Sequence, residues 1–183
     1  MLQLKFDPFP QLETERLILR NISLADAPEL FYLRSNKEVM KYIDREPQKT
    51  VEETETFIHF LLDMQAKNDA VLWVIALKEN SAVMIGNIGY WRMEKEHYRA
   101  EIGYMLHHDF WQKGIMKEAI KPVIDYGFTS MKLHTIEANI NPANKASEVL
   151  LESIGFVREG YFKENYFFNG IFSDSAIYSL LNR

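Results

Sequence analysis

The segment from Glu101 to Ala119 holds the residues whose types and spacing most clearly suggest chemistry. It reads EIGYMLHHDFWQKGIMKEA, which predicts a strand, a short loop containing Gly114 and the start of a long helix. The first amides of a helix have no internal partners and lie at the positive end of its dipole. With a glycine and a lysine beside it, such a junction suits a phosphate or pyrophosphate. An ordinary glycine-capped loop is the alternative, because the spacing matches neither the P-loop nor the dinucleotide fingerprint.

Other combinations of reactive residues give weaker evidence of function. His107, His108 and Asp109 suggest a metal at first sight, but neighbours on a strand would point to opposite faces and no further ligand is suitably spaced. The chain has no cysteine and no Gly-x-Ser-x-Gly motif, which excludes cysteine-bound metals, a cysteine nucleophile and a serine-hydrolase elbow. We therefore expect no metal. Aromatic residues near the C-terminus are expected to pack around a cleft rather than stack on bases, because the net charge is −5.

Hydrophobic periodicity predicts the elements that must position this segment. Strands are expected at 17–19, 71–78, 82–93, 98–106 and 133–141, and a hairpin is expected to turn at Asn169-Gly170. Helices are expected after the capping boxes Ser23/Asp26 and Thr50/Glu53, over 115–131, and from Asn141-Pro142 to Gly155. Three successive strands form an antiparallel meander, and a strand–helix–strand crossover follows. The fold class is therefore α+β.

Composition sets the outer limits. The 183 residues have 47 % hydrophobic and 26 % charged side chains, which is typical of a globular protein, and we expect a single domain over residues 1–183. The longest apolar run, from Ala70 to Leu77, is far too short to cross a membrane, and no secretory signal is visible. The acidic balance argues against direct nucleic-acid binding. These features predict a soluble, cytosolic protein.

Several short motifs, in order along residues 13–181, resemble the GNAT acetyltransferases. They are ETERLILR from Glu13, GNIG from Gly86, AEIGY from Ala100, the Asn141-Pro142-x-Asn144-x-x-Ser147 segment, and the closing residues from Asn169 to Leu180. The branch they suggest is the ribosomal-protein N-terminal acetyltransferases of the RimJ/RimL type. The resemblance implies a GNAT-like fold: a mixed, mostly antiparallel sheet, splayed at two parallel central strands, with helices on both faces.

The resemblance also implies where acetyl-CoA binds. The strands ending at Leu106 and Asn141 would splay apart and hold it in the gap, with the backbone of Tyr104, Met105 and Leu106 pairing with the pantetheine arm and Asn144 against it. The pyrophosphate loop falls on Gln112, Lys113, Gly114, Ile115, Met116 and Lys117. Two residues depart from the family pattern: Trp111 replaces a basic residue or Gln, and Met116 replaces a small residue.

Catalytic roles follow from the same resemblance. Glu101 and Glu137 lie on the polar faces of the two splayed strands, so either can serve as general base, and we prefer Glu101 slightly. The alternative for each is a solvated residue or an ion pair. Ser147 would assist the departing thiolate, because Leu151 stands where many GNAT enzymes have a tyrosine acid; plain capping and helix surface are the alternative for Asn144 and Ser147. Tyr166 and Glu164 are weaker candidates for acceptor contacts.

The expected reaction is transfer of acetyl from acetyl-CoA to a primary amine, with the N-terminal α-amino group of a ribosomal protein as the favoured acceptor. Because no cysteine can carry an acyl group, direct attack in a ternary complex is preferred. Two alternatives stay open. One is acetylation of a small amine such as a polyamine or aminoglycoside, and the other is a CoA-binding sensor without turnover. A homodimer is also left open.

Overall fold

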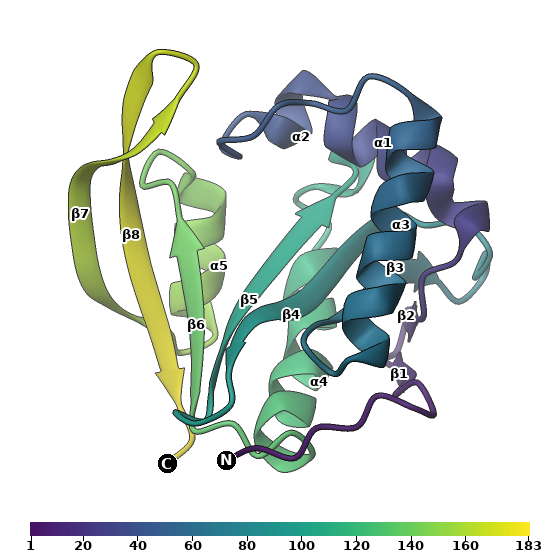
Figure 1. Cartoon of the computed structure of the whole chain (residues 1–183), viewed down its shortest axis with the longest axis horizontal. Coiled ribbons are helices and arrows are strands. Elements are labelled where there is room, and N and C mark those ends of the chain that lie inside the picture. Colours follow the sequence, from purple (N-terminus) through teal and green to yellow (C-terminus); the bar gives the residue numbers. More distant parts are fainter.

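An eight-stranded sheet forms the centre of the molecule (Figure 1). The computed structural model describes residues 1–183, and the strand order is β1-β2-β3-β4-β5-β6-β8-β7. The strands are β1 (Leu12–Glu13), β2 (Leu17–Arg20), β3 (Val71–Leu77), β4 (Gly86–Glu94), β5 (Arg99–Leu106), β6 (Thr135–Ile140), β7 (Val157–Phe168) and β8 (Ile171–Leu181). All neighbours are antiparallel except β5 and β6, which are parallel. The predicted meander, β3 to β5, and the mixed sheet are confirmed.

Four of the five helices begin at a polar N-cap residue, and the remaining one begins at Gly114. They are α1 (Ala27–Ser35), α2 (Lys37–Met40), α3 (Val51–Ala66), α4 (Ile115–Thr129) and α5 (Lys145–Ser153), with short 3-10 turns η1 (Leu24–Asp26) and η2 (His108–Phe110). The Thr50 hydroxyl accepts a hydrogen bond from the Glu53 amide at the start of α3, at 3.3 Å. The predicted start of α5 at Asn141-Pro142 is wrong. Asn141 instead accepts a bond from the Ala143 amide, and Asn144 caps the helix that begins at Lys145.

The two parallel strands pair only at their beginnings. β5 and β6 are in register at Arg99–Thr135, Ala100–Ile136 and Glu101–Glu137, and beyond these pairs the strands diverge (Figure 1). Each strand keeps its other neighbour, because β4 pairs along β5 as far as Leu106 and β8 pairs along β6 as far as Ile140. The sheet therefore splits between β5 and β6, which leaves one backbone edge of each strand without a strand partner.

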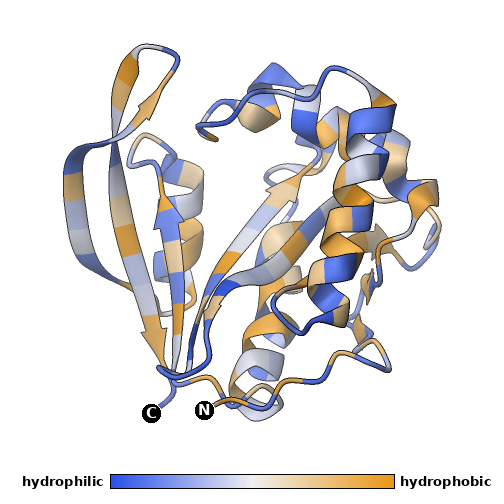
Figure 2. Ribbon diagram, viewed as in Figure 1, coloured by the Kyte–Doolittle hydropathy of each residue, from blue (hydrophilic) through white to orange (hydrophobic).

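Helices cover both faces of the sheet, which confirms the expected layers. The α4 residues Ala119, Ile120 and Val123 are fully buried in one core cluster, together with alternate residues of β3 such as Trp73. The intervening β3 residue Val74 belongs to a second cluster with α1 and α3 on the other face. Figure 2 shows hydrophobic and hydrophilic residues alternating around α3, as expected for a helix with one buried face. None of the helices combines the length and apolarity that crossing a bilayer requires.

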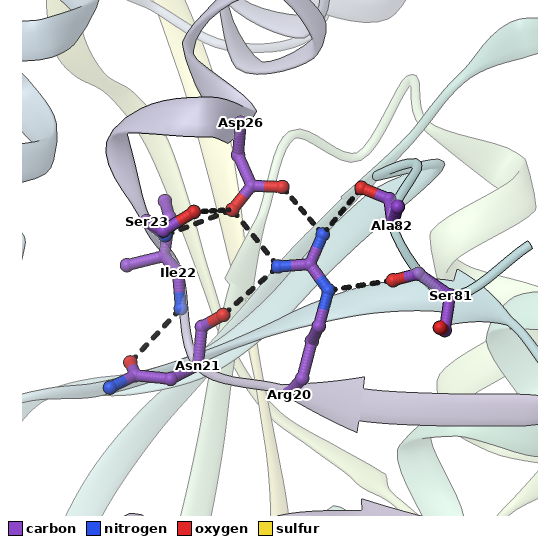
Figure 3. Close-up of polar contacts among 7 residues, drawn as sticks. All are labelled: Arg20, Asn21, Ile22, Ser23, Asp26, Ser81 and Ala82. Atoms are coloured by element: carbon purple, nitrogen blue, oxygen red, sulfur yellow. Dashed lines mark hydrogen bonds and ion pairs between the residues drawn. The ribbon is translucent and has the colours of Figure 1, made fainter.

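The start of α1 is fastened to the sheet by an ion pair (Figure 3). Both guanidinium Nη atoms of Arg20, at the end of β2, donate to the Asp26 carboxylate at 2.9 and 2.6 Å. Asp26 also accepts bonds from the amide and hydroxyl of Ser23, at 2.9 and 3.1 Å, which completes the predicted capping box. The Arg20 guanidinium further binds the carbonyls of Ser81 and Ala82. Because Asp26 is only 1 % exposed, this network fixes where α1 leaves the sheet.

We expect Asp26→Asn to lower the free energy of unfolding by about 2 kcal/mol, because a charge-assisted network loses its anion while Arg20 keeps its charge. Urea unfolding at neutral pH, followed by circular dichroism, measures this loss. Asp63→Asn is the matched control, since its carboxylate also pairs with a basic residue, Lys67, but is 55 % exposed. Equal, small effects of both substitutions would show that the Asp26 network does not anchor α1.

Candidate active site

A cavity of about 550 Å³ lies where β5 and β6 diverge. Its floor and walls come from both splayed strands, from β4 and from the first residues of α5. Its far wall is formed by α1, α3, the last residue of α2 and the segment 42–45 that follows it. The cavity thus opens between the two halves of the sheet, and α1 and α3 enclose it on one side.

The unpaired edge of β5 borders this cavity. Tyr104 and Met105 line it, and Leu106, just beyond, is buried at the start of the loop that leads to α4. The Leu106 carbonyl accepts a bond from the Trp111 indole at 2.8 Å, so the tryptophan that departs from the family pattern braces the loop. An extended ligand arm could pair with the β5 edge in the manner of an added strand.

The amides at the start of α4 have no acceptor within the protein. Gln112 and Gly114 have φ values of 59° and 74°, in the left-handed region, and Gly114 is the N-cap of α4. The amides of Gly114, Ile115, Met116 and Lys117 donate to no backbone or side-chain acceptor. Their geometry fits an anionic group at the start of α4, the site that the sequence predicts for a pyrophosphate. The large Met116 side chain is buried among core residues, so it does not cover these amides.

Three residues that the sequence reasoning did not single out hold this loop in place. Arg16 donates through Nη1 to the Lys113 carbonyl at 3.2 Å and through Nε to the Glu118 carboxylate at 2.6 Å. Glu118 also accepts bonds from the Thr14 hydroxyl, at 2.5 Å, and the Arg16 amide. Burial alone would raise the pKa of Glu118, but these hydrogen bonds lower it overall. Thr14 and Arg16 belong to the ETERLILR motif, which was the only indication in the sequence that they matter. Nothing in the sequence indicates that this motif contacts Glu118.

The two candidate bases have different surroundings although they are direct neighbours across β5 and β6. Glu101 lines the cavity, and its two oxygens accept bonds from the Trp91 indole, at 3.0 Å, and from Arg92, at 2.8 Å. Gly103 permits this arrangement, because a Cβ there would lie 1.9 Å from the Trp91 ring. A carboxylate has about four acceptor positions, so two bonds leave Glu101 able to accept a proton or a water.

Glu137 does not line the cavity. It accepts a bond from Arg99 at 3.0 Å, where the two strands are still paired. The same arginine also binds Glu94, at 2.6 Å. Both glutamates are therefore paired with an arginine, but only Glu101 also faces the cavity in which an acceptor could sit.

On α5, Ser147 and Asn144 face the cavity but Leu151 does not. Asn144 Oδ1 accepts a bond from the Ser147 amide at 3.2 Å, so Asn144 acts as the helix cap. Leu151 is fully buried in the core. The Tyr104 hydroxyl, which the sequence reasoning passed over, is buried beside Ser147. Burial raises the pKa of Tyr104 to about 12, and nearby Ser147 opposes part of this rise, although no hydrogen bond of normal geometry joins the two hydroxyls.

Of the two acceptor-contact candidates on β7, one lines the cavity and the other does not. Tyr166 on β7 lines the cavity, and its hydroxyl accepts a bond from the Asn139 amide group at 3.4 Å. Glu164 does not line the cavity, and its backbone amide donates to Asp174 at 2.8 Å.

The histidine cluster is arranged differently from the expectation. His107, His108 and Asp109 do not lie on a strand, because β5 ends at Leu106 and η2 follows. The two imidazoles stack at 5.0 Å, so their side chains share a side of the chain instead of pointing apart. His108 pairs with Asp109 at 2.9 Å and with the Tyr32 hydroxyl, and His107 accepts a bond from the Asp109 amide. These contacts connect η2 to α1.

Comparisons with known proteins identify the class. The family model for the acetyltransferase (GNAT) domain matches residues 16–157. The chain belongs to the GNAT acetyltransferase family, and it is an acetyl-CoA-dependent N-acetyltransferase. It is 39 % identical over 172 residues to the uncharacterized N-acetyltransferase p20 of Bacillus licheniformis, which covers 94 % of this chain and 96 % of that protein.

Two solved structures are also similar. A GNAT-family acetyltransferase from Bacillus anthracis has 32 % identity and a TM-score of 0.82, with 94 % of this chain and 98 % of that chain covered. A ribosomal-protein-S5-alanine acetyltransferase from Vibrio fischeri has 27 % identity and a TM-score of 0.81, with 94 % and 97 % covered. These similarities confirm the expected fold.

Proposed function

We propose that this enzyme acetylates the N-terminal α-amino group of a protein, with a ribosomal protein as the favoured acceptor. The observation that carries the proposal is a cavity that joins the unpaired β5 edge to Glu101 and Ser147 and opens between the two halves of the sheet. An extended N-terminal segment fits such an opening. The similarity to the S5-alanine acetyltransferase of Vibrio fischeri supports this class of acceptor.

In the proposed mechanism, acetyl-CoA supplies the acetyl group and its pyrophosphate lies at the amides of the α4 start. Glu101 accepts the proton of the ammonium nucleophile, directly or through a water. An α-amino group has an unperturbed pKa of about 7.7–8.0, so a carboxylate suffices for this step. The free amine nitrogen then attacks the thioester carbon, and a backbone amide of β5 stabilises the developing oxyanion. When the carbon–sulfur bond breaks, CoA leaves as a thiolate that the Ser147 hydroxyl stabilises, and the proton lost by the nitrogen converts it to the thiol.

A screen of amines and N-terminal peptides, followed by release of CoA, tests this function. We expect a peptide carrying a free N-terminus to be acetylated faster than the same peptide with a blocked N-terminus and a lysine side chain. Faster acetylation of spermidine or of an aminoglycoside would replace the proposed acceptor by a small amine. Tight acetyl-CoA binding without CoA release with any amine would indicate a sensor.

We expect Ser147→Ala to slow the chemical step by roughly tenfold to a hundredfold while acetyl-CoA affinity stays nearly unchanged. The physical reason is that a bond to sulfur strengthens only as the thiolate forms. Single-turnover kinetics measure the step. Ser153→Ala is the control, because Ser153 lies on the same helix but is exposed and donates to the Leu150 carbonyl at 2.8 Å.

Tyr104→Phe identifies the donor if Ser147 is not responsible. A normal rate in Ser147→Ala combined with a slow step in Tyr104→Phe would assign the proton to the tyrosine. Leu151→Tyr is not expected to restore the rate, because Leu151 is fully buried in the core and does not line the cavity.

A further inference from the structure

The cavity wall contains an arginine side chain that has no hydrogen-bond or ion-pair partner. Arg34, in the last turn of α1, lines the cavity with its guanidinium carbon 3.9 Å from the centre of the Phe57 ring. Its Nε is buried and makes no hydrogen bond, and no carboxylate lies within ion-pair distance of its guanidinium. A partly buried charge is costly unless it is paired, so this arrangement requires an explanation.

A second arginine increases the positive charge at this wall. Arg45, in the segment after α2, lines the same cavity and likewise forms no ion pair. Burial lowers the pKa of Arg34 to about 10, and the repulsion from Arg45 adds to the shift. The Arg34 carbonyl accepts a bond from the Gln48 amide at 2.9 Å, which ties the segment carrying Arg45 to the end of α1. The two charges are therefore held near each other by the fold.

The carboxylates that share the cavity are bound to other groups. Glu101 is paired with Arg92, and Asp44 accepts a bond from the Ser173 hydroxyl at 2.9 Å. Asp174 accepts bonds from the Tyr161 hydroxyl and the Glu164 amide. The donors to Asp44 and Asp174 are neutral, so both carboxylates keep their charge, but neither lies within ion-pair distance of Arg34 or Arg45. The two guanidinium groups are therefore free to bind an anion that enters the cavity.

We propose that Arg34, assisted by Arg45, binds an anionic group of the acceptor, so that the acceptor is a primary amine that also carries a carboxylate or a phosphate. A guanidinium suits both anions because its N–H groups form a planar fork. The aromatic ring of Phe57 orients the fork from below by a cation–π contact. The inference rests on the proposed amine acetylation and adds the chemical class of the acceptor.

Three pairs of amines that differ only in an anion test the inference. They are phosphoethanolamine and ethanolamine, the peptide Ala-Glu-Ala-Ala-amide and its Gln counterpart, and Ala-Ala-Ala with a free or an amidated C-terminus. We expect the anionic member of at least one pair to have a kcat/KM at least tenfold higher. The preferred pair distinguishes a phosphate, an acidic side chain and a terminal carboxylate as the source of the anion.

Substitutions at the two arginines test whether they cause the preference for the anionic amine. Arg34→Met should abolish the preference by slowing the anionic member at least tenfold more than the neutral member, and Arg45→Met should weaken the preference. Lys37→Met is the matched control, since Lys37 is an exposed cation on α2 that does not line the cavity. Arg34→Lys keeps the charge without the fork, and it tests the site even where the methionine variant folds poorly.

Binding separates this inference from the proposed function. If no amine is acetylated, the proposed function fails, and calorimetric titration of the same six compounds into the CoA-saturated protein still decides the anion site. An Arg34-dependent preference of at least tenfold in binding or turnover supports the proposal. Equal behaviour within all three pairs, or a preference that survives in Arg34→Met and Arg34→Lys, overturns it.

Discussion

Replacing Gly114 by valine should weaken acetyl-CoA binding about a thousandfold, or about 4 kcal/mol. The left-handed backbone at this residue, with φ at 74°, forms the turn into α4, and a β-branched residue resists that conformation. The protein itself has room for a side chain, because a Cβ would meet only the Arg16 guanidinium, at 3.7 Å. We therefore expect the loss to come from the altered backbone and from the side chain that would stand in front of the amides. Isothermal titration with acetyl-CoA measures it.

Gly170→Val is the matched control for this substitution. Gly170 has nearly the same backbone conformation, with φ at 79°, and a Cβ there would meet nothing within 4 Å. It lies in the hairpin turn between β7 and β8, away from α4. Both variants should lose similar stability from backbone strain, but only the Gly114 variant should lose affinity. Unchanged affinity in a folded Gly114→Val protein would contradict the assignment of this loop to the pyrophosphate.

Glu101→Gln should lower turnover by roughly a hundredfold or more with little change in acetyl-CoA affinity. The substitution keeps the size of the side chain and removes its ability to accept a proton. The amide can still accept a bond from Trp91 or Arg92, so the loss is expected in the chemical step and not in folding. Steady-state kinetics with saturating acetyl-CoA, together with calorimetric affinity, separate the two effects.

Glu137→Gln is a close control for this prediction. Glu137 is the register partner of Glu101 across β5 and β6 and is likewise bonded to an arginine, but it lies outside the cavity. Its substitution should leave turnover within a few-fold of the wild type. The opposite pattern, with Glu101→Gln active and Glu137→Gln inactive, would exchange the two roles. If both variants are active, a water chain or deprotonation of the substrate by itself must supply the free amine.

Much of the fold could be predicted from local sequence. The alternation of apolar and polar residues predicted β5 and β6, a mainly apolar run predicted β3, and the caps at Thr50 and Gly155 predicted where α3 begins and α5 ends. Such signals are local, because the periodicity of a helix or strand can be recognised within a short stretch of sequence. The start of α5 was misplaced because Asn141 and Asn144 are both good caps, and only the turn between them decides which one begins the helix.

The sequence by itself determined the elements, the loop with Gly114 at the start of α4, and two glutamates on polar strand faces. Only the tertiary structure decided which glutamate faces the cavity, because the divergence of β5 from β6 begins just beyond the pair they form. The bond between Arg16 and Glu118 joins residues 102 positions apart, and Arg34 meets Arg45 and Phe57 through the packing of separate segments. Contacts of this kind depend on how elements pack against one another, and sequence periodicity does not encode that packing.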